Sequence, residues 1–460
     1  MKDLTRGPVA GHVLQLASFI ALTTTFQTLY FLADLYFVGT LGREAIAGVS
    51  LAGNLAFLVL ALTQALGVGA TSLIAQALGR KQRERAELVF NQALVLASLT
   101  GLAFGLVAFA GRAAYCRWLA ADAVTAVQGT SYLAWFVPAL ALQFPLVALG
   151  AALRGMGDMK IPTAIQVATV LLNIALAPTL IFGWVSGRPL GVAGAALASL
   201  IAIAAGGVAF VAYFRRDASP FRFRARDWVP RPRLWGDMLR IGLPAGGEFA
   251  LISVYMVLVY DITRHFGTPA QAGFGIGVRL MQALFLPAVA IAFAAAPVAG
   301  QNFGAQLGER VREAFRAAAG MSVAVMLVFT VLCHVAPAAM VGFFSPDPAV
   351  VAFGSEYLRI VSWNFVASGL VLVTSSMFQG MGHTLPALAS SALRLLFFAV
   401  PAYTLSHRPG FEMRHVWYLS VASVTLQVAL NLWLLHREFD ARLAFASVPA
   451  PPPASGARIE

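Results

Sequence analysis

Charged residues are scarce in this sequence. Of its 460 residues, 11% are charged and 59% are hydrophobic, and the mean hydropathy is +0.77. Soluble domains carry about 25% charged residues, so this composition excludes a soluble protein and predicts a polytopic membrane protein. Cysteine is rarer still, with two residues in the whole sequence. Cys116 and Cys333 lie far apart, and their spacing indicates neither a disulfide framework nor a metal site.

Motifs of catalysis are also missing. The sequence contains no H-E-x-x-H, G-x-S-x-G or G-x-x-x-x-G-K-[ST] signature. A membrane enzyme would also need paired acids or histidine clusters within its apolar runs, and the sequence has neither. We therefore expect no enzymatic activity and no cofactor, and a membrane enzyme or scaffold is disfavoured.

Long apolar runs predict twelve membrane-spanning helices, because a spanning helix needs about 20 apolar residues. The fold class is thus an all-α polytopic membrane protein. The predicted spans are residues 10–38, 46–78, 88–111, 128–152, 161–184, 191–214, 239–265, 271–302, 315–342, 350–379, 385–405 and 414–435.

The basic residues predict the orientation of these spans. Of the 32 Lys and Arg residues, 22 lie in the segments on the side of the two termini, 7 on the opposite side and 3 within spans. This asymmetry places both termini in the cytoplasm. The net charge of +12 is read as a topology signal, so we expect the lipid bilayer and no nucleic acid as a partner.

The two halves of the chain resemble each other. Gln76 and Gln301 occupy similar motifs 225 residues apart, and so do Gly155 and Gly380. A repeat of six spans keeps its orientation, so we predict two pseudo-symmetric six-helix bundles around a cleft, which is typical of alternating-access transporters. The predicted parts are an N-lobe at 1–214, a basic linker at 215–238, a C-lobe at 239–436 and a tail at 437–460.

The linker alternates arginine with aromatic residues. We interpret it as an interfacial segment whose arginines meet lipid phosphates. Its aromatic side chains would then lie at the headgroup boundary: Phe221, Phe223, Trp228 and Trp235.

Asp34 is the one acid in the first apolar run, and no Lys or Arg stands one helical turn away. A carboxylate within a spanning helix costs about 2.5–3.5 kcal/mol on insertion scales, and such groups commonly carry protons, ions or substrate. The alternative is a charge at the helix end that reaches the interface, since Gly39 is five residues away. The repeat places Asp34 opposite Asp261, which has Arg264 one turn later.

Several motifs together resemble the MATE (multidrug and toxic compound extrusion) transporters, in particular the bacterial DinF-like branch. The resemblance covers nearly the whole chain, in order and in both halves. It is carried by Leu29-Tyr30…Asp34…Phe37-Val38-Gly39, Leu153-Arg154-Gly155-Met156-Gly157-Asp158 with Pro162, Gly191 to Ala196, Gly275 to Ala305, and Gln379-Gly380-Met381-Gly382 with Pro386.

The resemblance implies efflux driven by inward H⁺ or Na⁺, with an acid of the first helix as the coupling site. That acid is Asp34, and the matching partners are Tyr30, Asn173 and, by a softer alignment, Ser199. The sequence departs from the family at Ala177, where a second acid is common. Na⁺ needs several oxygen ligands and a proton only one carboxylate, so we favour H⁺ coupling, with Na⁺ at Asp34 and Asn173 as the alternative.

Four further charged residues are candidates for a polar or substrate site in the C-lobe. Glu248 is interpreted as lying near the cytoplasmic entrance, where an acid in the first turns favours the helix dipole. Arg279 is expected at the depth of Asp261, in a structural ion pair. Arg394 lies within a predicted span without a local partner, which makes it a candidate for the cavity wall.

The function that these observations predict is secondary active multidrug efflux. The protein would be a monomeric antiporter that exports small organic compounds, cationic or amphipathic, in exchange for H⁺ or Na⁺. The alternative within the same superfamily is a lipid-linked oligosaccharide flippase, which would need a strongly cationic central cavity.

Overall fold

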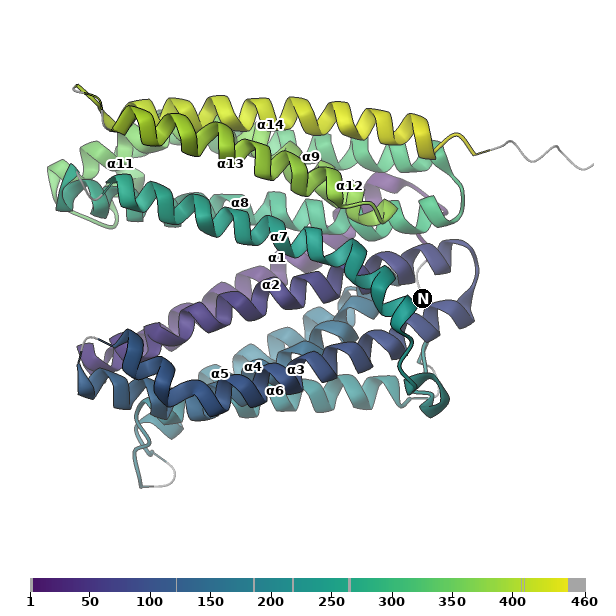
Figure 1. Cartoon of the computed structure of the whole chain (residues 1–460), viewed down its shortest axis with the longest axis horizontal. Helices are drawn as coiled ribbons and strands as arrows, with labels where there is room; N and C mark the ends of the chain where they lie inside the picture. Colours follow the sequence, from purple (N-terminus) through teal and green to yellow (C-terminus); the bar gives the residue numbers. More distant parts are fainter. Residues whose placement is uncertain are drawn as a thin grey trace, which may run out of the picture.

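The computed structural model describes residues 3–120, 122–184, 187–216, 219–263, 266–406, 408 and 410–445. Within these ranges the chain is helical and contains no strand (Figure 1). The elements are α1 (Val9–Gly39), α2 (Arg43–Gly79), α3 (Arg83–Leu119), α4 (Ala123–Gly155), α5 (Lys160–Ile181), α6 (Val192–Phe214), the short 3₁₀-helix η1 (Ala225–Trp228), α7 (Pro232–Thr263), α8 (Thr268–Gly304), α9 (Gly308–Val335), α10 (Pro337–Gly342), α11 (Pro348–Val361), α12 (Asn364–Met381), α13 (Leu385–Ser406) and α14 (Met413–Arg442).

The predicted twelve spans are confirmed, with one of them broken. Eleven single helices of the described chain are long and apolar enough to cross a membrane. The twelfth span is the pair α11 and α12, which bends by 54° at residues 362–363. The final helix continues to Arg442, six residues beyond the predicted end of the C-lobe.

The helices form two bundles that lie one above the other in Figure 1. We call α1–α6 the N-lobe and α7–α14 the C-lobe. In the N-lobe α4 is central and packs against α2, α3 and α6, and in the C-lobe α12 packs in the same way against α8, α9 and α14. The two lobes are therefore built alike, as the repeat predicts.

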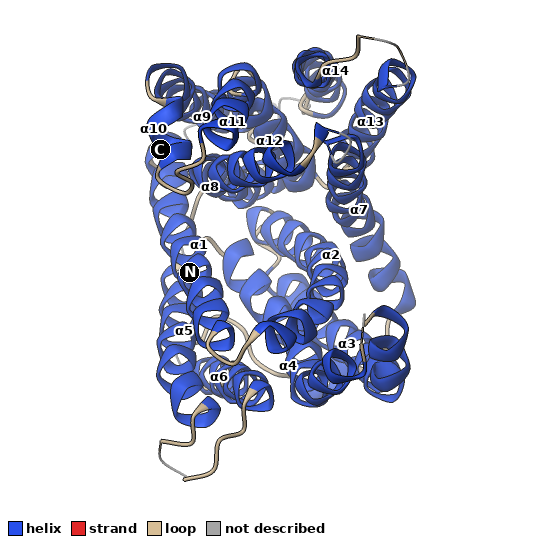
Figure 2. Cartoon of the chain, turned by 90° about the vertical axis from the view of Figure 1, so that its left-hand side faces the viewer, coloured by secondary structure: helices blue, strands red, loops and turns tan. Residues whose placement is uncertain are grey.

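The first helix of each lobe also packs against the opposite lobe. Helix α1 packs against α5 and against α8, while α7 packs against α13 and against α2. Figure 2 shows α1 and α7 on opposite flanks between the two lobes. A movement of either lobe must therefore shift the packing of these two helices.

The lobes meet closely at one end, which we call the basic end. It carries the connections from α2 to α3, α4 to α5, α6 to α7 and α8 to α9. Here Gly79 of α2 and Gly304 of α8 lie so close to the opposite helix that a Cβ on either would overlap a backbone carbonyl oxygen, of Gln301 and of Gln76 respectively. Glycine is therefore required at this crossing.

Two amide hydrogen bonds fasten the same end. From α2, Gln76 Nε2 donates to the Gly380 carbonyl oxygen at 3.0 Å. From α8, Gln301 Nε2 donates to the Gly155 carbonyl oxygen at 2.9 Å. These are the residues of the 225-residue repeat, so the repeat motifs form a two-fold latch between the lobes.

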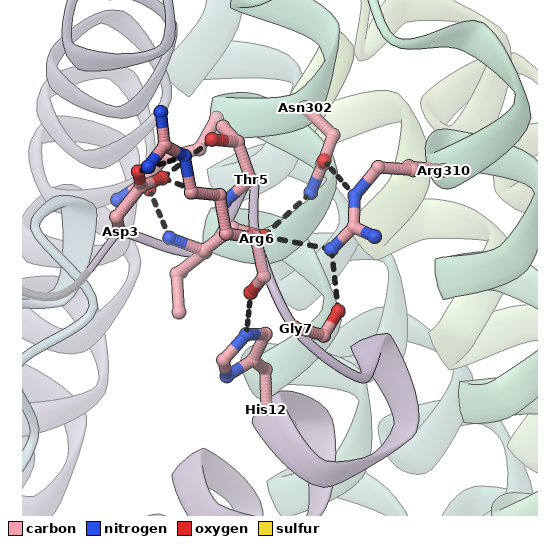
Figure 3. Close-up of polar contacts among 9 residues, drawn as sticks. Asp3, Thr5, Arg6, Gly7, His12, Asn302 and Arg310 are labelled. Atoms are coloured by element: carbon pink, nitrogen blue, oxygen red, sulfur yellow. Dashed lines mark hydrogen bonds and ion pairs between the residues drawn. The ribbon is translucent and has the colours of Figure 1, made fainter.

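The segment before α1 lies beside this latch, and Figure 3 shows its contact with Arg310 through Gly7. The Leu4 side chain is fully buried and packs against Gly157. The Leu4 amide donates to Gln301 Oε1 at 3.0 Å, and its carbonyl oxygen accepts from Asn302 Nδ2 at 3.2 Å. Arg310 donates to the Gly7 carbonyl oxygen at 2.9 Å. The start of the chain thus joins both lobes at the basic end.

The linker is bound to the N-lobe, which corrects two expectations. Helix α7 begins at Pro232, inside the segment predicted as linker. Phe221 is fully buried and stacks on Phe90, so it does not lie at the headgroup boundary. The backbone amide and carbonyl groups of the linker lie against α3, and they need hydrogen-bond partners there. Polar side chains of α3 supply these partners.

Asn91 provides the central contacts of this attachment. Its Nδ2 donates to the Arg222 carbonyl oxygen at 3.0 Å. Its Oδ1 accepts from the Arg224 amide at 3.2 Å and from Trp228 Nε1 at 3.0 Å. Beside it, Glu87 forms a 2.7 Å ion pair with Arg224.

We expect Asn91→Ala to lower the melting temperature by about 2–5 °C, because it leaves buried donors and an acceptor unpaired at about 1–3 kcal/mol. The measurement is thermal unfolding of purified protein in detergent. Ser98→Ala, at an exposed position of the same helix, is the control and should leave the melting temperature unchanged. Equal melting temperatures for both variants would show that the linker is not held by Asn91.

Candidate functional site

Three of the predicted coupling residues form one buried hydrogen-bond network in the N-lobe. The Tyr30 hydroxyl on α1 lies 2.9 Å from Ser199 Oγ on α6. Asn173 Nδ2 on α5 donates to the same oxygen at 3.2 Å, and Ser199 Oγ donates to the Ala195 carbonyl oxygen. Because a serine hydroxyl has one proton, Tyr30 is the donor in its contact with Ser199. The network joins α1 to α5 and α6.

Asp34 lies one turn beyond Tyr30 and remains outside these hydrogen bonds. Its carboxylate is within electrostatic reach of the hydroxyls of Tyr30 and Tyr132. Among the described residues its buried Oδ1 has no hydrogen-bond partner. A carboxylate oxygen buried without a partner is costly while it is ionised. Asp34 is therefore suited to change its charge state.

The second acid common at position 177 has no substitute nearby. Ala177 is buried among the apolar side chains of Ile181, Val192 and Ala195. No group of three or more His, Cys, Asp or Glu residues that could hold a metal ion occurs in the part of the chain that the structure describes. Asp34 is thus the acid around which this site is built.

The C-lobe repeats part of the network, and the repeat corrects the expected image of Asp34. Tyr255 follows Tyr30 by 225 residues, and its hydroxyl lies 2.9 Å from Ser420 Oγ. With this register Asp34 corresponds to Val259, which is buried in the C-lobe core. Asp261, the expected image, is exposed. The pairing was wrong because it was aligned on the following Gly-Thr motif rather than on the tyrosines.

Glu248 lies inside the C-lobe rather than near a helix start. Because α7 begins at Pro232, Glu248 is 16 residues into the helix, a rise of about 24 Å, so the argument from the helix dipole was wrong. Both of its carboxylate oxygens accept from Ser375 Oγ of α12, at 2.9 and 2.8 Å. Glu248 is thus a second acid within a spanning helix, half-buried and in the opposite lobe from Asp34.

The remaining C-lobe candidates are not brought together. Arg279 is exposed, and within the described structure it forms no ion pair with Asp261. Arg264, the other expected partner of Asp261, lies outside the described residues. The Arg394 guanidinium on α13 stacks over the Tyr255 ring at 5.0 Å. Its buried Nε has no hydrogen-bond partner among the described residues.

A cavity of about 170 Å³ lies between the lobes, next to the latch. Its wall combines residues of α1, α2 and α4 with residues of α8 and α12. Arg154 is the charged residue of this wall, although charge counting assigned it to a loop. A side chain at the C-terminal end of a helix points back toward the N-terminus, and the Arg154 guanidinium accordingly lies beside Gly150.

The two-lobed architecture, with acids inside the lobes and a cavity where the lobes meet, is that of a membrane transporter with a parallel repeat. The chain belongs to the MatE family, whose model matches residues 20–179 and 244–404. These two matched segments fall in the N-lobe and the C-lobe respectively. Members of this family are transporters and not enzymes, as the sequence predicts.

Two bacterial relatives match most of the chain. The probable multidrug resistance protein YoeA of Bacillus subtilis (strain 168) is 27% identical over 406 residues, which cover 86% of this chain and 87% of that protein. The multidrug export protein MepA of Staphylococcus aureus (strain N315) is 26% identical over 403 residues, which cover 84% of this chain and 86% of that protein.

Solved structures confirm the fold. An outward-facing multidrug resistance MATE family transporter of the MOP superfamily superimposes with a TM-score of 0.88 at 24% identity, covering 96% of this chain and 98% of that chain. A MOP superfamily transporter from Pyrococcus furiosus, described as having a binding pocket of reverse polarity, has a TM-score of 0.88 at 23% identity and covers 95% of this chain and 98% of that chain.

Proposed function

We propose that this protein is a secondary active multidrug efflux antiporter, which exports small organic compounds in exchange for H⁺. The observation that carries the proposal is Asp34, an acid with an unpartnered buried oxygen beside a network that joins α1, α5 and α6. The names of the relatives from Bacillus subtilis and Staphylococcus aureus support multidrug export. A single acid at this site favours H⁺ over Na⁺.

In this mechanism Asp34 alternates between an ionised and a protonated state. A proton that enters from outside removes the charge of Asp34 and changes the packing of α1 against α2, α5 and α6. Because α1 also packs against α8, this change reaches the opposite lobe. The different affinities of proton and substrate for the two states of the lobes supply the coupling.

The proposal includes the orientation of the chain and its state of assembly. With the basic end in the cytoplasm, as the positive-inside rule requires, the latch closes the cytoplasmic side and the structure faces outward. The transporter acts as a monomer in the bacterial inner membrane. A flippase for lipid-linked oligosaccharides is disfavoured, because among the described residues Arg154 is the only Lys or Arg that lines the cavity between the lobes.

The driving ion can be tested in everted membrane vesicles that load a fluorescent organic cation. Collapse of the pH gradient at constant Na⁺ should abolish uptake, because the proposed coupling ion is H⁺. Collapse of the Na⁺ gradient at constant pH should leave uptake unchanged. If uptake instead depended on the Na⁺ gradient and not on the pH gradient, the coupling ion would be Na⁺, bound at Asp34 and Asn173. Uptake that survives both treatments would contradict antiport.

A further inference from the structure

The cavity between the lobes lies on the pseudo-two-fold axis. Its wall contains three pairs of positions that are 225 residues apart, as the latch does. They are Val68 with Phe293, Thr71 with Ala296, and Arg154 with Gln379. In the last pair a cation of the N-lobe stands opposite a neutral amide of the C-lobe. The cavity is therefore symmetric in position and asymmetric in charge.

Arg154 has no counter-charge in this cavity. None of the described residues that line the cavity is an acid. Within the described chain, the Arg154 side chain takes part in no hydrogen bond or ion pair, although its backbone carbonyl oxygen accepts from the Gly157 amide. A charge inside a membrane protein is costly unless it is paired, and it commonly marks a substrate pathway. An anion in the cavity would provide the missing partner.

The other polar groups of the wall divide into two kinds. The hydroxyls of Thr24 and Thr71 already donate to the backbone carbonyl oxygens of Ala21 and Ala151. The side-chain amides of Gln64 and Gln379 make no hydrogen bond in the part of the chain that the structure describes. Three unused donor groups, one of them charged, therefore converge on the cavity.

The size of the cavity limits what it can hold. Pockets that enclose a drug-sized ligand measure about 300–1,000 Å³, whereas this cavity measures about 170 Å³. It accommodates a headgroup and not a whole drug. The apolar side chains of Ile20, Met159 and Phe293 would contact the adjoining apolar part of the ligand.

We propose that this cavity binds a compact oxyanion group of an amphipathic ligand, a carboxylate, sulfonate or phosphate, with Arg154 as its ion-pair partner and Gln64 and Gln379 as further donors. The inference rests on the proposed function and adds a substrate class to it. The transporter would accept compounds with an anionic headgroup as well as cationic compounds. Arg154 precedes Gly155, whose carbonyl oxygen accepts the latch bond of Gln301. The bound anion would therefore lie one residue from the closure of the basic end.

A matched pair of probes tests the charge preference. Naphthalene-2-sulfonate and naphthyl-trimethylammonium share an apolar body and differ in the sign of the headgroup. Binding is measured as the ligand-induced rise in melting temperature of the purified full chain in neutral detergent. We expect Arg154→Gln to weaken sulfonate binding at least tenfold and Gln379→Ala to weaken it two- to tenfold. Neither variant should change ammonium binding. The proposal would be overturned if Arg154→Gln bound the sulfonate with an affinity within twofold of that of the unaltered protein. It would also be overturned if the unaltered protein did not bind the sulfonate.

The melting temperature without ligand separates binding from a structural role. Removal of an unpaired buried charge should leave the melting temperature of Arg154→Gln unchanged or higher. Arg154→Lys keeps the charge and should retain part of the sulfonate binding. If both variants unfold at lower temperature and bind sulfonate equally, Arg154 is structural and the proposal fails.

Native mass spectrometry identifies the source of the anion. A co-purified phosphatidylglycerol that sulfonate displaces, and that Arg154→Gln lacks, would assign the site to a lipid headgroup. Sulfonate binding without bound lipid would assign it to a free amphipathic anion, and both results support the oxyanion site. Because binding in detergent requires no ion gradient, a failure of this test is distinct from a failure of H⁺ antiport.

Discussion

Asp34→Asn should abolish efflux and ion exchange together while the protein still inserts at normal levels. Asparagine keeps the size of aspartate and holds the site permanently uncharged, so the step that couples the ion to the lobes is lost. We expect efflux of a fluorescent cation from everted vesicles to fall at least tenfold, with no substrate-induced release of H⁺. Because the Asp34 Oδ1 is buried without a partner in the described structure, the variant should not unfold at a lower temperature.

Asp261→Asn is the matched control for this experiment. It makes the same chemical change at an exposed position of α7, and we expect efflux within twofold of the unaltered protein. Efflux and ion release that persist in Asp34→Asn would move the coupling site to another acid within a spanning helix. Glu248 with its partner Ser375 would be examined first. Loss of transport in both variants would mean that the assay does not isolate the N-lobe site.

Gly79→Ala should open the basic end. The added Cβ would overlap the Gln301 carbonyl oxygen, and backbone atoms of two packed helices cannot yield as a flexible side chain can. Helices α2 and α8 must then separate, which also breaks the latch bonds of Gln76 and Gln301, each worth about 0.5–1.5 kcal/mol. Two such bonds correspond to a shift of roughly tenfold in the population of the open end.

The shift can be measured in a Leu4→Cys background, as the rate at which the new thiol reacts with a maleimide added at the basic end. Leu4 is fully buried in the closed structure, and the two native cysteines are also buried, so the background is low. We expect Gly79→Ala to raise the labelling rate about tenfold and to reduce efflux to a similar extent. Gly53→Ala in the same helix is the control, because a Cβ at Gly53 meets nothing within 4 Å. Equal labelling of the two variants would exclude the glycine crossing as the closure.

The twelve spans could be predicted because hydrophobic length is a local property of the sequence. The broken span at residues 362–363 could not be predicted, since the residues on both sides remain apolar. The start of α7 was misplaced for a different reason. Its first turns are charged and extend beyond the apolar run, and this error also misplaced Glu248 relative to the helix start.

The candidate site was predictable in part. Tyr30, Asn173 and Ser199 were expected to lie near one another from a family pattern, and the structure joins them by hydrogen bonds. Arg154 was missed as a cavity residue because a count of charges records the position along the chain and not the direction of the side chain. The latch glutamines were noticed as a repeat, but their partners are more than 140 residues away, beyond any local pattern.

The attachment of Leu4 to Gln301 also sets an order of events during synthesis. The two residues are 297 positions apart, so at 5–20 residues per second a ribosome needs about 15–60 s to make the partner after Leu4 has emerged. In the later part of this interval the N-lobe helices are already available to pack, and Leu4 can contact Gly157 but not Gln301. Leu4 thus reaches its final position only after Gln301 has been made, and closure of the basic end can report that both lobes have been assembled.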